Sequence, residues 1–141
     1  MSRLLHGGSQ PDGDEAGQRR CRAGRRRVRR RLGGVDQAGD LRRTVELIVR
    51  QVGHWQQPRW AASAAGGNVS RADLVHRLVQ ELANLAADAE ARPRRVVPRL
   101  DHDLALPDQL RVVAADLLAA KASDAALAQA TNAVTATRAA L

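Results

Sequence analysis

The chain has 141 residues, which suits one domain with a terminal extension and not two full domains. Its formal net charge is +8, its aromatic residues are two Trp, and it holds a single cysteine. One cysteine excludes an internal disulfide framework and a multi-cysteine zinc site, and an apolar fraction built on Ala, Leu and Val disfavours a β-sandwich.

The positive charge is concentrated in the N-terminal quarter of the chain. Residues 1–35 contain ten Arg and three acidic residues, a net charge of +7, whereas residues 36–141 contain 13 basic and 12 acidic residues, a net charge of +1. The first segment has too few large apolar side chains to offset the entropy of ordering. We therefore expect residues 1–35 to form a disordered Arg-rich arm and residues 36–141 to form one helical domain.

Two interpretations of the arm compete. Its arginines suit non-specific phosphate binding by counterion release, although no aromatic side chains are interleaved for base stacking; they are Arg25, Arg26, Arg27, Arg29, Arg30 and Arg31. Alternatively, residues 1–34 arise from a mis-assigned start, and translation begins near Val35. The charge balance changes abruptly there, and a sequence rich in Arg, Gly and Ala is typical of translated GC-rich non-coding DNA.

The first helical pattern follows the arm. Apolar residues recur at spacings of three and four from Leu41 to Trp55, which predicts a helix over that range. Asp40 is the expected N-cap, since its carboxylate is placed to accept a hydrogen bond from an amide of the first turn. Gly53 weakens the pattern, and Pro58 is expected to stop the helix.

A second helix is the clearest in the chain. Residues 61–69 form a Gly-rich loop, after which Ser70 is the expected N-cap of a helix that ends near Ala91, before Pro93. Leu78 is central to its apolar stripe. The sequence therefore predicts a long amphipathic helix with one buried face.

Two further helices follow an irregular joint. Residues 92–106 are expected to be extended or looped, because prolines disfavour helix both at their own position and at the preceding residue. Pro107 suits the first turn of a third helix, and Ser123 is the expected N-cap of a fourth that reaches Leu141. The fold class that results is all-α: a small bundle of three to four helices preceded by the disordered basic arm.

The sequence offers little catalytic chemistry. His102 stands between Asp101 and Asp103, but adjacent residues of an extended chain point to opposite sides, which favours a solvated polar turn over a metal site. No Gly-rich phosphate motif, nucleophile motif or metal-ligand spacing occurs. We therefore expect no catalytic residues, no cofactor and no metal ion, and a protein that is not an enzyme.

The two tryptophans give the sharpest local pattern. Trp55 and Trp60 flank Pro58, and one interpretation is that both rings pack together and close one end of the bundle. The other is that Arg59 and Trp60 form an exposed anchor for a partner, since Trp and Arg dominate interface hot spots.

These observations favour a non-enzymatic protein–protein interaction module, with self-association expected through the Ala-rich third and fourth helices. The alternative is a nucleic-acid-associated protein that acts non-specifically through the arginine run of the arm. No apolar stretch reaches the length of a secretory signal or a membrane span, so we expect a cytoplasmic protein that does not bind membranes.

Overall fold

The computed structural model describes residues 35–141, and helices account for most of them, with no β-strand in that range. The elements in chain order are α2 (Gln37–Val52), α3 (Gln57–Ala61), α4 (Arg71–Ala89), the 3₁₀ helix η1 (Asp103–Ala105), α5 (Leu106–Ala119) and α6 (Asp124–Ala140). The all-α class is therefore confirmed for these residues. The predicted disordered arm lies outside them, apart from Val35.

Helix α2 begins and ends earlier than predicted. Its N-cap is Asp36 and not Asp40, because the Asp36 carboxylate accepts a hydrogen bond from the Gly39 amide at 2.9 Å. Asp40 instead lies in the first turn and pairs with Arg43. The helix ends at Val52, so that Trp55 lies beyond it.

Helix α3 was not predicted. Pro58 was expected only to stop the first helix, but it lies in the first turn of this five-residue helix. A missing N–H is harmless there, since the first amides of a helix have no intrahelical partner. Pro58 therefore starts a new helix, which carries Trp60 back towards the bundle.

The caps predicted for the later helices are confirmed. Ser70 accepts a hydrogen bond from the Asp73 amide, and Ser123 accepts one from the Ala126 amide. Pro107 lies in the first turn of α5. In each case the deciding interaction is local, which is why the sequence alone predicted it.

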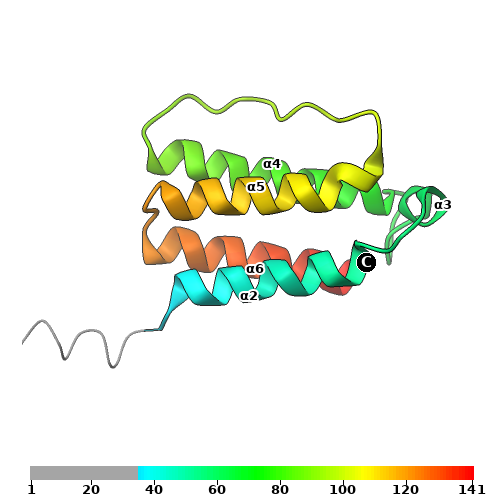
Figure 1. Ribbon diagram of the computed structural model, residues 1–141, viewed down its shortest axis with the longest axis horizontal. Helices are drawn as coiled ribbons and strands as arrows, with labels where there is room; N and C mark the ends of the chain where they lie inside the picture. The colour runs from blue at the N-terminus through cyan, green and yellow to red at the C-terminus, as the bar shows by residue number, and fades with distance from the viewer. Residues whose placement is uncertain (1–34) are drawn as a thin grey trace, which may run out of the picture. The chain divides into compact units, whose positions relative to one another are not determined.

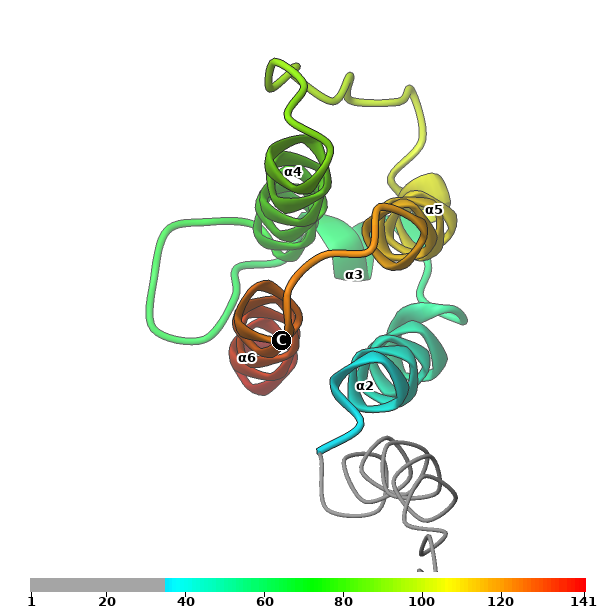
Figure 2. The same ribbon diagram turned by 90° about the vertical axis from the view of Figure 1, so that its left-hand side faces the viewer.

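The four long helices form a bundle, which Figure 2 shows nearly end-on with one helix at each corner. Helix α4 packs most extensively on α5, and α2 on α6, while α2 and α5 and also α4 and α6 are neighbours. Helices α4 and α5 run in one direction and α2 and α6 in the other (Figure 1). None of the described helices has the length and apolar character that a membrane span requires.

Because α4 and α5 are parallel neighbours, the chain must return along the full length of the bundle between them. Helix α4 has 19 residues and is about 28 Å long. Residues 90–102, which we call the crossover, would cover only about 20 Å as an α-helix, so they span the distance as a non-helical chain, which reaches about 43 Å when fully extended. Figure 1 shows this segment running outside α4 and α5 from one end of the bundle to the other. The irregular joint predicted over residues 92–106 is confirmed, apart from the 3₁₀ turn η1 and Leu106, which begins α5.

One hydrophobic core fills the bundle. It takes side chains from all four long helices and from both tryptophans. Leu78 is 2% exposed, as its central place in the predicted stripe requires. Helix α6 contributes only three buried side chains to this core, namely Leu127, Ala130 and Val134.

Candidate functional site

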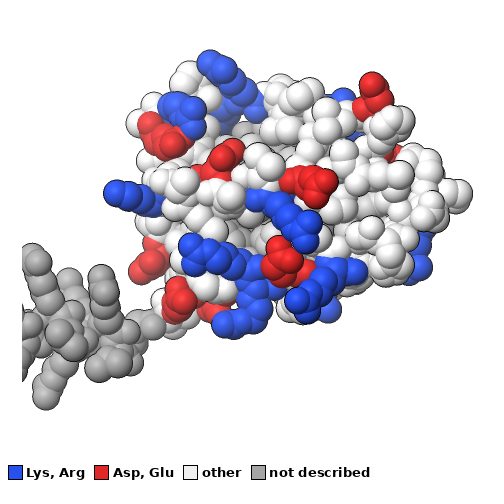
Figure 3. Space-filling model, viewed as in Figure 1, with Lys and Arg blue, Asp and Glu red and all other residues white. Residues whose placement is uncertain are grey.

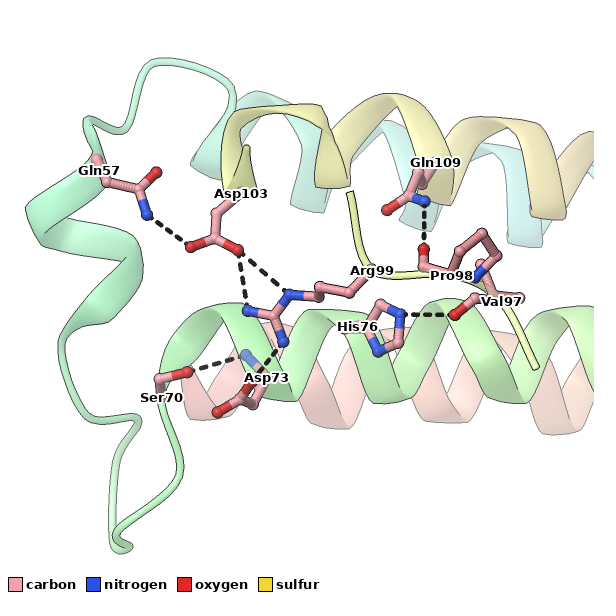
Figure 4. Close-up of polar contacts among 9 residues, drawn as sticks. All are labelled: Gln57, Ser70, Asp73, His76, Val97, Pro98, Arg99, Asp103 and Gln109. Carbon is pink, nitrogen blue, oxygen red and sulfur yellow. Dashed lines mark hydrogen bonds and ion pairs between the residues drawn. The ribbon is translucent and has the colours of Figure 1, made fainter. Parts of the chain in front are cut away.

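Polar side chains of α4 and α5 hold the crossover by its backbone. The Gln80 side chain accepts a hydrogen bond from the Val97 amide at 2.7 Å and donates one to the Arg95 carbonyl at 2.9 Å. His76 Nε2 lies 3.1 Å from the Val97 carbonyl, and it must carry the proton, since a carbonyl only accepts. Gln109 of α5 donates to the Pro98 carbonyl at 3.2 Å (Figure 4). The crossover is thus fixed at its centre.

Arg99 anchors the far end of the crossover. Its guanidinium pairs with Asp73 of α4 and with Asp103 of η1, while Gln57 of α3 donates to Asp103 at 2.7 Å (Figure 4). The hydrogen bond from Arg99, followed by that from Ser70, holds the pKa of Asp73 below its ordinary value. This cluster therefore joins four segments of the chain at one end of the bundle.

Most of the crossover faces solvent. From Ala91 to Leu100 every residue is exposed except Val97, which is half-buried. Its neighbour Val96 is 86% exposed. Val97 packs against the core, and the remaining contacts described above are polar, so Val96 and Leu100 are left exposed.

Exposed apolar side chains gather around this segment. Six large apolar residues of the described part are exposed, and four of them lie on the crossover, η1 or α5: Val96 at 86%, Leu100 at 45%, Leu104 at 51% and Val112 at 59%. We call these four residues the crossover face. Such grouping is unlike the single apolar residues scattered over most protein surfaces, and it is typical of interaction sites.

Two hollows lie beside the half-buried Val97. One, of about 320 Å³, lies where the crossover passes over Ala83 and Ala86 of α4, and Arg95 and Val96 contribute to its wall. The other, of about 270 Å³, is lined mainly by apolar side chains, including Leu100 and Val112. We call the second one the Leu100 hollow. Since Leu100 and Val112 share it, the crossover and α5 present their apolar side chains together.

Some charged side chains around the crossover form ion pairs, and others do not. Arg92 pairs with Glu90, and Arg94 pairs with Asp88 through two hydrogen bonds. Among residues 35–141, neither Arg95 nor Asp101 forms an ion pair, and both are exposed. These two charges thus flank the stretch that holds Val96 and Leu100.

The surface of the described residues carries no large area of one charge on the side that Figure 3 shows. Basic and acidic side chains lie side by side there. One example is Arg111 of α5, which contacts Glu46 of α2 through two hydrogen bonds of 3.2 and 3.3 Å. On this side the helical domain presents no extended basic surface for phosphates.

Arg59 and Trp60 do not form the exposed anchor that was predicted. Trp60 is 0% exposed, because α3 folds its ring against that of Trp55, with the ring centroids 5.2 Å apart in an edge-to-face arrangement. The exposed Arg59 guanidinium lies 4.6 Å from the centroid of the Trp55 ring. Trp60 therefore closes one end of the bundle, and its ring offers no surface to a partner in this conformation.

The acidic residues on either side of His102 do not form a common site with it. Asp103 belongs to the Arg99 cluster, whereas Asp101 and His102 are exposed. Within residues 35–141, no group of three or more His, Cys, Asp and Glu side chains is placed to hold a metal ion. The six arginines expected to contact phosphate (Arg25, Arg26, Arg27, Arg29, Arg30 and Arg31) lie outside the described residues.

Sequence reasoning missed the crossover face altogether. Val96, Leu100 and Leu104 lie in the proline-rich joint that was expected to be an irregular linker, and Val112 lies in α5 beside the buried Val113. The available signal was the presence of large apolar residues in a segment without helical period.

Comparisons with protein-family models, curated proteins and solved structures found no match to the chain.

Proposed function

We propose that the protein is a non-enzymatic interaction module that binds a protein partner through the crossover face. The observation that carries this proposal is that the exposed Leu100 and Val112 line one hollow at the side of the bundle, while the exposed Val96 and Leu104 lie on the same crossover and on the adjoining η1. Covering these side chains removes apolar surface from water, which is the main driving force of association.

The way in which the crossover is held supports the same proposal. Its backbone is fixed by Gln80, His76 and Gln109, so the exposed side chains are presented by a chain that is already ordered. A preordered surface loses less conformational entropy on binding than a flexible loop does. The crossover therefore suits recognition better than an unattached linker of the same composition.

Affinity capture with the full chain tests this function. Proteins of the source organism that bind the wild-type chain are compared with those that bind Leu100→Glu/Val112→Glu, which places two charges at the hollow. Leu47→Glu is the matched control, because Leu47 is a 41% exposed apolar residue of α2, outside the crossover face. Circular dichroism checks that all three chains are folded.

We expect at least one partner to be lost with the double variant and kept with Leu47→Glu. If both variants keep the same partners as the wild type, the crossover face is not the binding site. If both lose the same partners, the effect is general and the proposal also fails.

A further inference from the structure

We infer that the partner of the crossover face is a second copy of this chain, which docks with its crossover antiparallel to the first. This inference rests on the proposed function, since it names the partner of the same face. It places a two-fold axis next to Pro98, at the centre of the exposed stretch. A closed pair with a two-fold axis is the commonest arrangement of soluble oligomers.

The exposed stretch is complementary to itself in charge. An antiparallel arrangement centred on Pro98 places residue 95 opposite residue 101 of the second copy, and residue 96 opposite residue 100. The first pair joins Arg95 to Asp101, two exposed groups that form no ion pair within the described part of one chain. The two-fold axis therefore creates two such ion pairs, and in each pair the two charges come from different copies.

The apolar side chains of the two copies also match in this register. Val96, at 86%, is the most exposed large apolar side chain of the described residues. In the antiparallel pair it lies opposite Leu100 of the second copy, which lines the 270 Å³ Leu100 hollow together with Val112. The pair therefore covers a protruding valine with an apolar hollow at two symmetrical places.

At the middle of the interface, most backbone polar groups already have a partner. Pro98 has no N–H, and its carbonyl already accepts from Gln109. Val97 has its N–H bonded to Gln80 and its carbonyl to His76. The centre of the crossover therefore brings few unpaired backbone groups into the interface, where each would cost free energy if left without a partner.

The crossover face is not the surface that the composition favoured for self-association. Self-association was expected through the Ala-rich third and fourth helices, α5 and α6. The exposed residues of α6 are small or polar, such as Ala125, Gln129 and Asn132. Such a face offers little apolar area, whereas the crossover face joins apolar side chains to complementary charges.

Disulfide trapping tests the register of the pair. The full chain is prepared with Cys21→Ser, and Val96→Cys and Leu100→Cys are added in separate chains. We expect mixed oxidation to join Val96→Cys to Leu100→Cys. Val96→Cys alone joins poorly to itself, because residues 96 of the two copies are about 13 Å apart along an antiparallel pair. A disulfide needs Cα atoms within about 7 Å of each other.

Charge exchange tests the same register without a covalent bond. Arg95→Asp places like charges opposite each other, and so does Asp101→Arg. Each variant alone is expected to associate about tenfold more weakly than the wild type by sedimentation equilibrium. An equimolar mixture of the two restores association, because every pair across the interface again joins opposite charges.

The outcomes separate this inference from the proposed function. A wild-type chain that sediments as a monomer at high micromolar concentration overturns the inference, and so does a dimer in which Val96→Cys joins to itself as readily as to Leu100→Cys. Failure to restore association in the mixture also counts against it. In all three cases, capture of a different protein that depends on Leu100 and Val112 still supports the proposed function.

Discussion

The side-chain amide of Gln80 in α4 bonds the crossover backbone at Val97 in the way that the backbone of a neighbouring β-strand would. Its Oε1 accepts from the Val97 amide at 2.7 Å, while its Nε2 donates to the Arg95 carbonyl two residues earlier at 2.9 Å. These two hydrogen bonds fix which side chains of the crossover face solvent. Gln80 thus supplies two of the four side-chain hydrogen bonds that α4 and α5 make to the backbone of the crossover.

Replacing Gln80 should therefore release the crossover and leave the bundle intact. Gln80→Ala removes both hydrogen bonds, and each contributes about 1 kcal/mol. We expect faster hydrogen exchange at the Val97 amide and faster trypsin cleavage after Arg94 and Arg95, with α-helical circular dichroism unchanged. Gln80→Glu is the matched control, because it retains an acceptor for the Val97 amide and loses the donor. Unchanged cleavage in Gln80→Ala would show that other contacts hold the crossover.

Both tryptophans should behave as core residues. Trp55 is 3% exposed and Trp60 0%, and their rings contact each other, so replacing either by Ala is expected to lower the free energy of unfolding by about 3–5 kcal/mol. Single-tryptophan chains made with Trp55→Phe or Trp60→Phe should both show blue-shifted fluorescence. Red-shifted emission from the chain that retains Trp60 would restore the exposed-anchor interpretation.

The Arg99 cluster should make stability depend on pH at the acidic end of the range. Arg99 and then Ser70 hold the pKa of Asp73 below its ordinary value of 3.8, so the folded protein takes up this proton less readily than the unfolded chain does. This stabilisation is present above the unfolded pKa and is lost as the pH falls through the lower pKa of the folded state.

Arg99→Gln should consequently raise the pKa of Asp73 towards 3.8, as measured by an NMR titration of its carboxyl group. The loss of stability relative to the wild type should be larger at neutral pH than at acidic pH, because the contribution of Asp73 disappears once its carboxylate is protonated. Arg42→Gln serves as the control, since Arg42 is exposed on α2 and has no carboxylate partner among the described residues. An unchanged Asp73 pKa in Arg99→Gln would contradict the assigned cause.

At the start of the crossover, one residue adopts the left-handed backbone conformation that favours glycine. Ala91 has φ 53°, and it follows α4 in a turn where the Arg92 amide donates to the Ala87 carbonyl at 2.8 Å. Ala91→Gly is expected to stabilise the protein by about 1 kcal/mol, because the left-handed region costs a residue with a Cβ about that much. Ala115→Gly, in the middle of α5, should destabilise by a similar amount. Chemical denaturation measures both changes, and destabilisation by Ala91→Gly would refute the argument.

The alternative function depends on residues 1–34 and has its own test. A chain in which the six arginines from Arg25 to Arg31 are replaced by Gln is compared with the wild type for binding to duplex DNA by fluorescence anisotropy. If the arm binds phosphates, the wild-type affinity should fall steeply with salt, and the variant should lose both the affinity and the salt dependence. Equal binding by the two chains would exclude the arginine run as a nucleic-acid site.

The sequence by itself determined the features that depend on neighbouring residues. The serine caps of α4 and α6, the proline that opens α5 and the apolar stripe around Leu78 all follow from interactions within one or two helical turns. The start of α2 was missed because two aspartates four residues apart are both plausible caps. The choice of Asp36 depends on where its carboxylate meets the Gly39 amide.

Only the tertiary structure decided which apolar residues face solvent outside the helices. Val96 and Val97 are identical in type and adjacent, yet Val96 is 86% exposed and Val97 is half-buried. Nothing in their local sequence separates them, because an irregular segment has no period that assigns faces. Their difference comes from Gln80 and His76, which lie 17 and 21 residues before Val97 and turn its backbone towards α4. The burial of Trp60 has the same origin, since it requires α3 to fold back over Trp55.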